Sequence, residues 1–163
     1  MKKPAEKTNA LRMLSQRGIP YTAHDYTESG AVSGPEVAAA LGEDPDKVFK
    51  TLVTMGKSGQ HYVFVLPVCR ELDLKKAAAA VKEKNVAMIP QKELLPLTGY
   101  VHGGCSPIGM KKLFPTVLHD SAGNLDTLCV SGGRIGLQVE LTPEALGKLA
   151  PFTLADIVTE EES

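Results

Sequence analysis

The chain has 163 residues, of which 43% are hydrophobic and 23% charged, the proportions of an ordinary globular protein with one buried core. No apolar run approaches the ~20 residues that span a membrane, and the charged N-terminus lacks the apolar stretch of a secretion signal. We therefore expect a cytoplasmic location and no membrane partner. The net charge of −1 argues against tight phosphate-mediated binding of nucleic acid, so an RNA partner would be held weakly or with help from a second protein.

Hydrophobic periodicity, glycine stops and capping residues predict alternating helices and strands in the first half of the chain. In order, these are a helix over 7–17, a strand over 19–26, a loop over 27–31, a helix from Ser33 to Gly42, a turn at Asp44 and Pro45, and a hairpin of strands over 48–55 and 61–67.

The second half continues this alternation around one irregular segment. Its elements are a helix over 74–84 with Asp73 as N-cap, a strand over 86–89, a helical turn over 92–95, an irregular segment over 98–107, a helix over 108–113, strands over 116–119, 127–130 and 137–140, and a final helix begun by Pro143. Without a repeat or a linker, this order predicts a single domain over 1–163 of the α/β (α+β) class, built on a mixed β-sheet.

The cysteines and histidines indicate neither a disulfide framework nor a metal site. Cys69, Cys105 and Cys129 form no CxxC pair and no even set, so we expect free thiols, with the two in apolar strand-like segments buried. The four histidines show no metal-binding spacing. The sequence therefore predicts no metal and leaves open only a site assembled by the tertiary structure.

The glycine-rich segment 99–109 is the most informative stretch for chemistry. Gly103, Gly104 and Gly109 allow positive φ angles, and successive amide donors in such a turn can hold a carbonyl oxygen as it becomes an oxyanion. Pro107 fixes the turn. A tight turn without a ligand is an equally good interpretation of the pattern alone.

Lys50 is the single cation in the apolar segment 48–53, and it shares a strand face with Val48 and Leu52. It could project into a pocket and there bind a phosphate or a carbonyl, or orient water. A solvent-exposed lysine at the start of a strand is the simpler explanation from composition alone.

Further candidates come from a second glycine-rich run, over 130–136, and from the first predicted strand. Ser131 could donate a hydrogen bond to a substrate and Arg134 could bind a phosphate, although the pattern alone favours a simple hairpin turn for this run. Tyr26 and His24 alternate on one strand face and could line a pocket, but ordinary packing is the commoner cause of such a pattern.

Five motifs in order resemble the YbaK/EbsC family. They are Val48-Phe49-Lys50-Thr51-Leu52, the segment 71–78, the segment 98–101, Gly103 to Gly109, and the segment 130–137. The resemblance runs from about Thr8 to Ile157. The best-known members of this family are free-standing Cys-tRNA(Pro) deacylases, relatives of the editing domain inserted in some prolyl-tRNA synthetases.

The resemblance implies a curved mixed sheet flanked by helices, and an active site without metal or cofactor. It assigns the family's essential lysine to Lys50, its pocket tyrosine to Tyr26, and the serine that follows a late strand to Ser131. These residues are therefore expected at the substrate site.

The family's GxxxP loop corresponds to residues 103–107 of this chain. The resemblance makes Gly103, Gly104 and Ser106 candidate catalytic positions, and Cys105 and Pro107 candidate substrate-binding positions. No protein nucleophile is generally invoked in this family. The resemblance instead implies that the thiol of the cysteinyl substrate attacks its own ester carbonyl, that the loop amides stabilise the oxyanion, and that Lys50 holds the terminal adenosine or its phosphate.

The hypothesis is accordingly a trans-editing deacylase acting on Cys-tRNA(Pro), with aminoacyl-tRNA as substrate and prolyl-tRNA synthetase as a candidate partner. Three alternatives stay open: a deacylase for another small amino acid, as in Ala-tRNA(Pro); a non-catalytic module that binds tRNA or a synthetase; and a hydrolase with Cys105 as nucleophile, near His102 but without an identifiable orienting acid.

Overall fold

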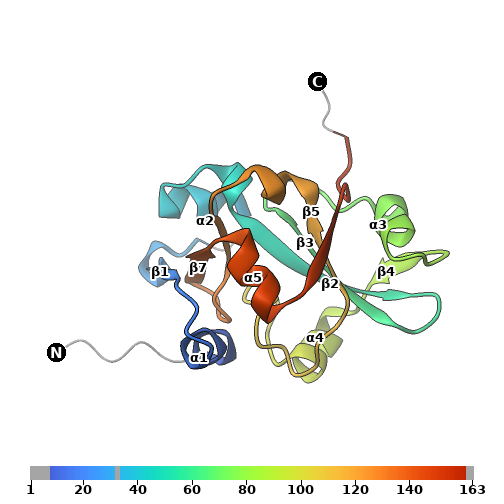
Figure 1. The fold of residues 1–163 in the computed structure, drawn as a ribbon, viewed down its shortest axis with the longest axis horizontal. Coiled ribbons are helices and arrows are strands. Elements are labelled where there is room, and N and C mark those ends of the chain that lie inside the picture. Colours follow the sequence, from blue (N-terminus) through green and yellow to red (C-terminus); the bar gives the residue numbers. More distant parts are fainter. Residues whose placement is uncertain (1–7, 32–33, 161–163) are drawn as a thin grey trace.

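The computed structural model describes residues 8–31 and 34–160. This part of the chain contains five α-helices and eight strands, and the strands form two β-sheets (Figure 1). The smaller sheet is antiparallel, with strand order β1-β7-β6. Its strands are Thr22–Asp25 (β1), Leu128–Ser131 (β6) and Leu137–Leu141 (β7).

The larger sheet is mixed, with strand order β4-β2-β3-β5-β8. Antiparallel pairing joins β4, β2 and β3, whereas β5 pairs in parallel with both β3 and β8. Its strands are Phe49–Gly56 (β2), His61–Pro67 (β3), Val86–Met88 (β4), Thr116–His119 (β5) and Phe152–Ala155 (β8).

The helices flank these sheets, with α3 at the opposite end of the molecule from α1, β1 and β7 (Figure 1). They are Asn9–Gln16 (α1), Gly34–Leu41 (α2), Leu74–Ala80 (α3), Gln91–Thr98 (α4) and Pro143–Leu149 (α5). Short 3₁₀ turns cover Thr27–Ser29, Pro45–Lys47 and Asp120–Asn124. In the described part of the chain no helix has the length and apolar character that spanning a membrane requires.

Side-chain caps define several helix starts. The Asp73 carboxylate accepts hydrogen bonds from the amides of Lys75 and Lys76, which confirms the predicted N-cap of α3. The Thr8 hydroxyl accepts from the amide of Leu11 at the start of α1 and also donates to the carbonyl of Gly132. The first helix is thereby tied to the second glycine-rich run.

The two sheets share their largest core cluster. Val53 and Val65 of the larger sheet belong to it together with Val130 and Val139 of the smaller sheet, and all four are at most 2% exposed. Each such fully buried aliphatic side chain stabilises the fold by ~1.5–3 kcal/mol. The shared core holds the sheets in a fixed relation to one another.

The predicted α/β class and the hairpin of β2 and β3 are confirmed, with the strands divided between two sheets. The helix predicted over 108–113 is wrong. Gly109 has φ +77° there, and a Cβ at this position would lie 2.9 Å from the backbone of Asn9, so the chain turns tightly against α1 instead. Strand β8 was not predicted, because only its parallel pairing with β5 distinguishes this short, half-exposed segment from a loop.

Smaller differences concern the end of one helix and one of the thiols. Helix α3 ends at Ala80 rather than at Lys84, and Lys82 just beyond it has φ +60°. Cys129 is buried as expected, but Cys69 lies beyond the end of β3 and is exposed. Ser33 is outside the described residues.

Candidate active site

A cavity of about 320 Å³ lies where the two sheets meet. A single parallel bridge between Val48 and Cys129 joins the residue before β2 to β6, and the cavity opens beside this bridge. Its walls come from β2, the ends of β6 and β7, and the loop that follows α4. Five of the site residues expected from the sequence line it: Tyr26, Lys50, Gly103, Cys105 and Ser131.

Lys50 provides the positive charge of this cavity. It lies on β2 opposite Leu66 and is partly exposed. Among the described residues no carboxylate forms an ion pair with it. The ammonium group is therefore available to a negatively charged or carbonyl-bearing ligand.

The turn Val101–Gly104 presents the backbone to the cavity. The amide of Gly104 donates to the carbonyl of Val101 at 3.0 Å, and Gly103 has φ +87°, as the third residue of a type II turn requires. Within residues 8–31 and 34–160, the amides of Gly103 and Cys105 have no intramolecular acceptor. These two N–H groups, one in the turn and one just after it, are candidate oxyanion donors beside the cavity.

Ser131 closes the cavity at the end of β6. Its hydroxyl oxygen accepts from the amide of Gly133 at 3.1 Å, which leaves the hydroxyl hydrogen to donate to a ligand. Tyr26 is 7% exposed and is held by a hydrogen bond from its amide to the carbonyl of Gly136.

Three of the expected residues do not line the cavity. Gly104, Ser106 and Pro107 are buried behind the turn, and the Ser106 hydroxyl accepts from the amide of Ile108 at 3.1 Å. A Cβ on Gly104 would lie 2.9 Å from the backbone of Arg134. In this structure these residues support the shape of the loop rather than contact the cavity.

Cys105 is poorly suited to nucleophilic attack. Burial raises the pKa of its thiol to about 12, so the thiol stays protonated at neutral pH. Thr98 and Tyr100 lie beside it, and burial likewise raises the pKa of the Tyr100 hydroxyl. This protonation state argues against Cys105 as the nucleophile of a hydrolase.

Two residues that the sequence analysis did not single out complete the site. Gln138 is 6% exposed, and both its Oε1 and the Oγ1 of Thr51 are buried without a hydrogen-bond partner in the described structure. An unsatisfied buried polar atom costs ~1–3 kcal/mol, so both oxygens favour a ligand that bonds to them. The alternation of polar Gln138 and Glu140 with apolar residues along β7 was the available signal.

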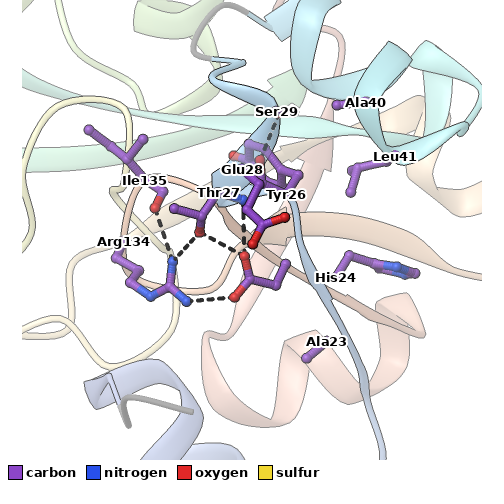
Figure 2. A pocket seen from close by; sticks show the side chains of 11 residues that line it. Ala23, His24, Tyr26, Thr27, Glu28, Ser29, Ala40, Leu41, Arg134 and Ile135 are labelled. Atoms are coloured by element: carbon purple, nitrogen blue, oxygen red, sulfur yellow. Dashed lines mark hydrogen bonds and ion pairs between the residues drawn. The ribbon is translucent and has the colours of Figure 1, made fainter. Parts of the chain in front are cut away.

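A wider groove of about 1140 Å³ adjoins this cavity, and Tyr26 lines both. In the groove, Arg134 binds Asp25 at 3.0 Å and Thr27 at 3.0 Å (Figure 2). Hydrogen bonds from Thr27, together with Arg134, lower the pKa of Asp25 to about 2. The guanidinium group considered for phosphate binding is thus already paired with a carboxylate.

A family model and a curated relative both relate this chain to proteins that edit aminoacyl-tRNA. The family model of the aminoacyl-tRNA editing domain matches residues 28–149, a range that includes the cavity residues from Lys50 to Gln138. A protein of Enterococcus faecalis (strain ATCC 700802 / V583) named as the Cys-tRNA(Pro)/Cys-tRNA(Cys) deacylase EbsC is 45% identical over 161 residues, covering 98% of each chain.

Two solved structures share the fold. One, described as a trans-editing enzyme for prolyl tRNA synthetase, has a TM-score of 0.81 at 24% identity and covers 93% of this chain and 96% of its own. Another, of a hypothetical protein, has a TM-score of 0.84 at 22% identity, with coverages of 93% and 99%. At such identities the likeness concerns the fold alone.

Proposed function

Because this chain belongs to the aminoacyl-tRNA editing domain family, we propose that it is an aminoacyl-tRNA deacylase that removes cysteine from Cys-tRNA(Pro) in trans. The observation that carries this proposal is the convergence of Lys50, the 101–104 turn and the unpartnered Gln138 in one cavity. A tRNA substrate implies that the protein acts in the cytoplasm.

The cavity matches the aminoacyl end of such a substrate in size. Its volume of about 320 Å³ is at the low end of the ~300–1,000 Å³ of small-molecule pockets, so it accommodates the amino acid and its ester rather than a chain of nucleotides. The adjoining groove leaves room for the nucleotide end outside.

Each polar group of the cavity has a complementary group on the substrate. The Oε1 of Gln138 accepts from the α-ammonium group, and the amides of Gly103 and Cys105 donate to the ester carbonyl oxygen. Lys50 binds the terminal ribose-phosphate, and Ser131 donates to the ribose or the ester.

The chemical step requires no nucleophile from the protein. The substrate thiol attacks its own ester carbonyl, a C–S bond forms, the C–O bond to the ribose breaks, and the thiol proton is transferred to the departing ribose oxygen. Holding the thiol and the ester in one small cavity supplies the necessary orientation. The protonated state of Cys105 agrees with this division of roles.

The experiment is release of amino acid from Cys-tRNA(Pro), Ala-tRNA(Pro) and Pro-tRNA(Pro) by the wild type and by Lys50→Ala and Gln138→Leu. We expect rapid loss of cysteine only, and a fall in kcat/KM of ~10²-fold or more for Lys50→Ala. Cysteinyl-tRNA with an S-methylated thiol should resist cleavage. Release of alanine would instead indicate attack by water and a different amino-acid preference.

A non-catalytic module that binds tRNA or a synthetase is the second candidate, favoured by the net charge of −1. Turnover of none of the three substrates, together with co-purification with prolyl-tRNA synthetase, would establish it. If the enzyme is active, added synthetase should lower KM most at high salt, where the weak phosphate contacts of this chain are screened.

A further inference from the structure

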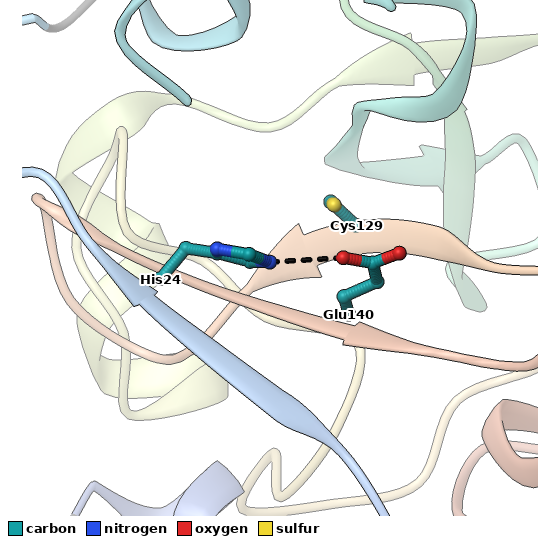
Figure 3. A group of neighbouring side chains, drawn as sticks. All are labelled: His24, Cys129 and Glu140. Atoms are coloured by element: carbon teal, nitrogen blue, oxygen red, sulfur yellow. Dashed lines mark hydrogen bonds and ion pairs between the residues drawn. The ribbon is translucent and has the colours of Figure 1, made fainter. Parts of the chain in front are cut away.

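A second group of chemically reactive side chains lies outside the catalytic cavity, on one face of the smaller sheet. His24, Cys129 and Glu140 belong to β1, β6 and β7, and their nitrogen, sulfur and oxygen donor atoms all lie within 4.8 Å of one another (Figure 3). Strand register explains the convergence, because Cys129 is the partner of Glu140 and His24 is the partner of the neighbouring Gln138.

We propose that these three residues form a binding site for a zinc-class divalent cation. Imidazole nitrogen, thiolate sulfur and carboxylate oxygen are the three donor types that Zn²⁺ takes in proteins, and three protein ligands leave a fourth position for water. Sequence spacing could not reveal the site, because Cys129 and Glu140 lie 105 and 116 positions after His24 in the chain.

The carboxylate of Glu140 is oriented for this role by its neighbours. Its Oε1 faces the His24 Nε2 at 2.9 Å, while its Oε2 accepts from the Thr127 hydroxyl and lies 3.5 Å from the Lys47 ammonium group. Thr127 and Lys47 thus hold one oxygen, and the other faces His24, where the metal would replace the hydrogen bond between them. Such outer contacts orient the ligands of known zinc sites.

Charge balance also favours a divalent cation. One cation of charge +2 with a thiolate, a carboxylate and a neutral imidazole makes a neutral assembly, which is less costly to bury than a net charge. The nearby Lys47 adds no net charge to this assembly, because its ammonium group also pairs with the Glu43 carboxylate at 3.8 Å. On metal binding the thiol proton of Cys129 leaves to bulk water, and the Nε2 proton that His24 donates to Glu140 moves to Nδ1, so that Nε2 can coordinate the metal.

The site is open to solvent on the side of His24, whereas Cys129 is fully buried, and the site adjoins the catalytic cavity. His24 lines the open groove, which gives a path for the ion and for its water ligand. A bound metal would tie all three strands of the smaller sheet together, and the next residues on the same face, Ser131 and Gln138, line the cavity. Metal binding would therefore stiffen that wall of the substrate site.

The test is Co²⁺ titration of the reduced, tag-free full-length protein, followed by absorption spectroscopy. We expect a thiolate-to-Co²⁺ charge-transfer band with the visible bands of a tetrahedral ion, and competition by Zn²⁺. Both features should disappear in Cys129→Ala and in His24→Gln. They should persist in Cys69→Ala, which removes the exposed thiol.

Two results would overturn the proposal. One is the absence of a thiolate band in the wild type at saturating Co²⁺, which would leave His24 and Glu140 as a hydrogen-bonded pair beside a buried thiol. The other is a band that survives Cys129→Ala or is lost in Cys69→Ala. His24 is about one-quarter exposed, so His24→Gln keeps the test valid if the buried Cys129→Ala variant fails to fold.

Discussion

The two glycine-rich loops of this protein, 99–109 and 131–136, look alike in sequence and differ in what their glycines do. In the first, Gly103 lines the cavity, and a Cβ there would meet only the Ile135 side chain, at 3.5 Å. In the second, a Cβ on Gly133 would lie 2.8 Å from the Cβ of Thr8. Positive φ angles of +87° and +103° are common to the two positions.

Glycine residues therefore have two different structural roles in this protein. In the proposed function Gly103 lets backbone amides face the ligand, whereas Gly133, like Gly109 at the end of the first loop, lets α1 approach closely. The loops also depend on one another, since Gly104 packs on the backbone of Arg134. Substitution of Gly103 in the first loop should therefore lower mainly the turnover, and substitution of Gly133 in the second loop mainly the free energy of unfolding.

Gly103→Ala should have the largest effect on turnover. Alanine at φ +87° is strained by ~1–2 kcal/mol, and relaxation of the turn would displace the amides that face the cavity. We expect kcat/KM to fall by ~10²–10³-fold, as when an oxyanion donor is lost, with a small loss of stability. Deacylation kinetics and urea unfolding of the same sample measure both. A variant with normal turnover would remove this turn from the mechanism.

Gly133→Ala should show the opposite pattern. The same backbone strain is joined here by overlap with Thr8, and together they should lower the free energy of unfolding by ~2–3 kcal/mol. Turnover per folded molecule should stay within a few-fold of the wild type. Urea denaturation gives the first quantity, and active-site-normalised kinetics the second. Equal losses of turnover in both glycine variants would end the distinction between the loops.

Ser131→Ala tests the one side chain of the second loop that reaches the cavity. We expect an increase in KM of about tenfold, because one hydrogen bond to the substrate is lost, and a destabilisation of ~1 kcal/mol from the lost contact with the Gly133 amide. Steady-state kinetics with cysteinyl-tRNA checks the first effect. An unchanged KM would mean that Ser131 only supports the loop.

The smallest expected effect concerns Asp25, which lies at the end of β1 and pairs with Arg134 of the second loop. Because the folded-state pKa of Asp25 is about 2, against an ordinary 3.8, its contribution to stability is complete above pH 4 and is lost as the pH falls toward 2. Asp25→Asn should therefore lose less stability than the wild type between pH 4 and pH 2. The difference should be slight, since the carboxylate is 58% exposed and screened. Thermal unfolding at both pH values measures it, and parallel curves would contradict the stabilising hydrogen bonds that Thr27 and Arg134 donate to this carboxylate.

Local sequence signals were sufficient for most elements and for part of the site. The hairpin of β2 and β3 and the Asp73 cap follow from alternation and capping chemistry, which act over a few residues. The family motifs likewise identified Lys50, Gly103 and Ser131, which the fold brings into one cavity. Ser106 and Pro107 belong to the same motif, yet they lie behind the loop, because a motif records which residues occur together and not which way they face.

The sequence by itself determined the α/β class, most of the strands, and the lysine and glycine turn around which the cavity is built, because periodicity and turn chemistry are local properties of the chain. Only the tertiary structure decided the partition into two sheets, the addition of β8, and the unpartnered Gln138. It alone also brought together His24, Cys129 and Glu140. These features arise from strand pairing between distant segments, and no local pattern specifies which strands become neighbours.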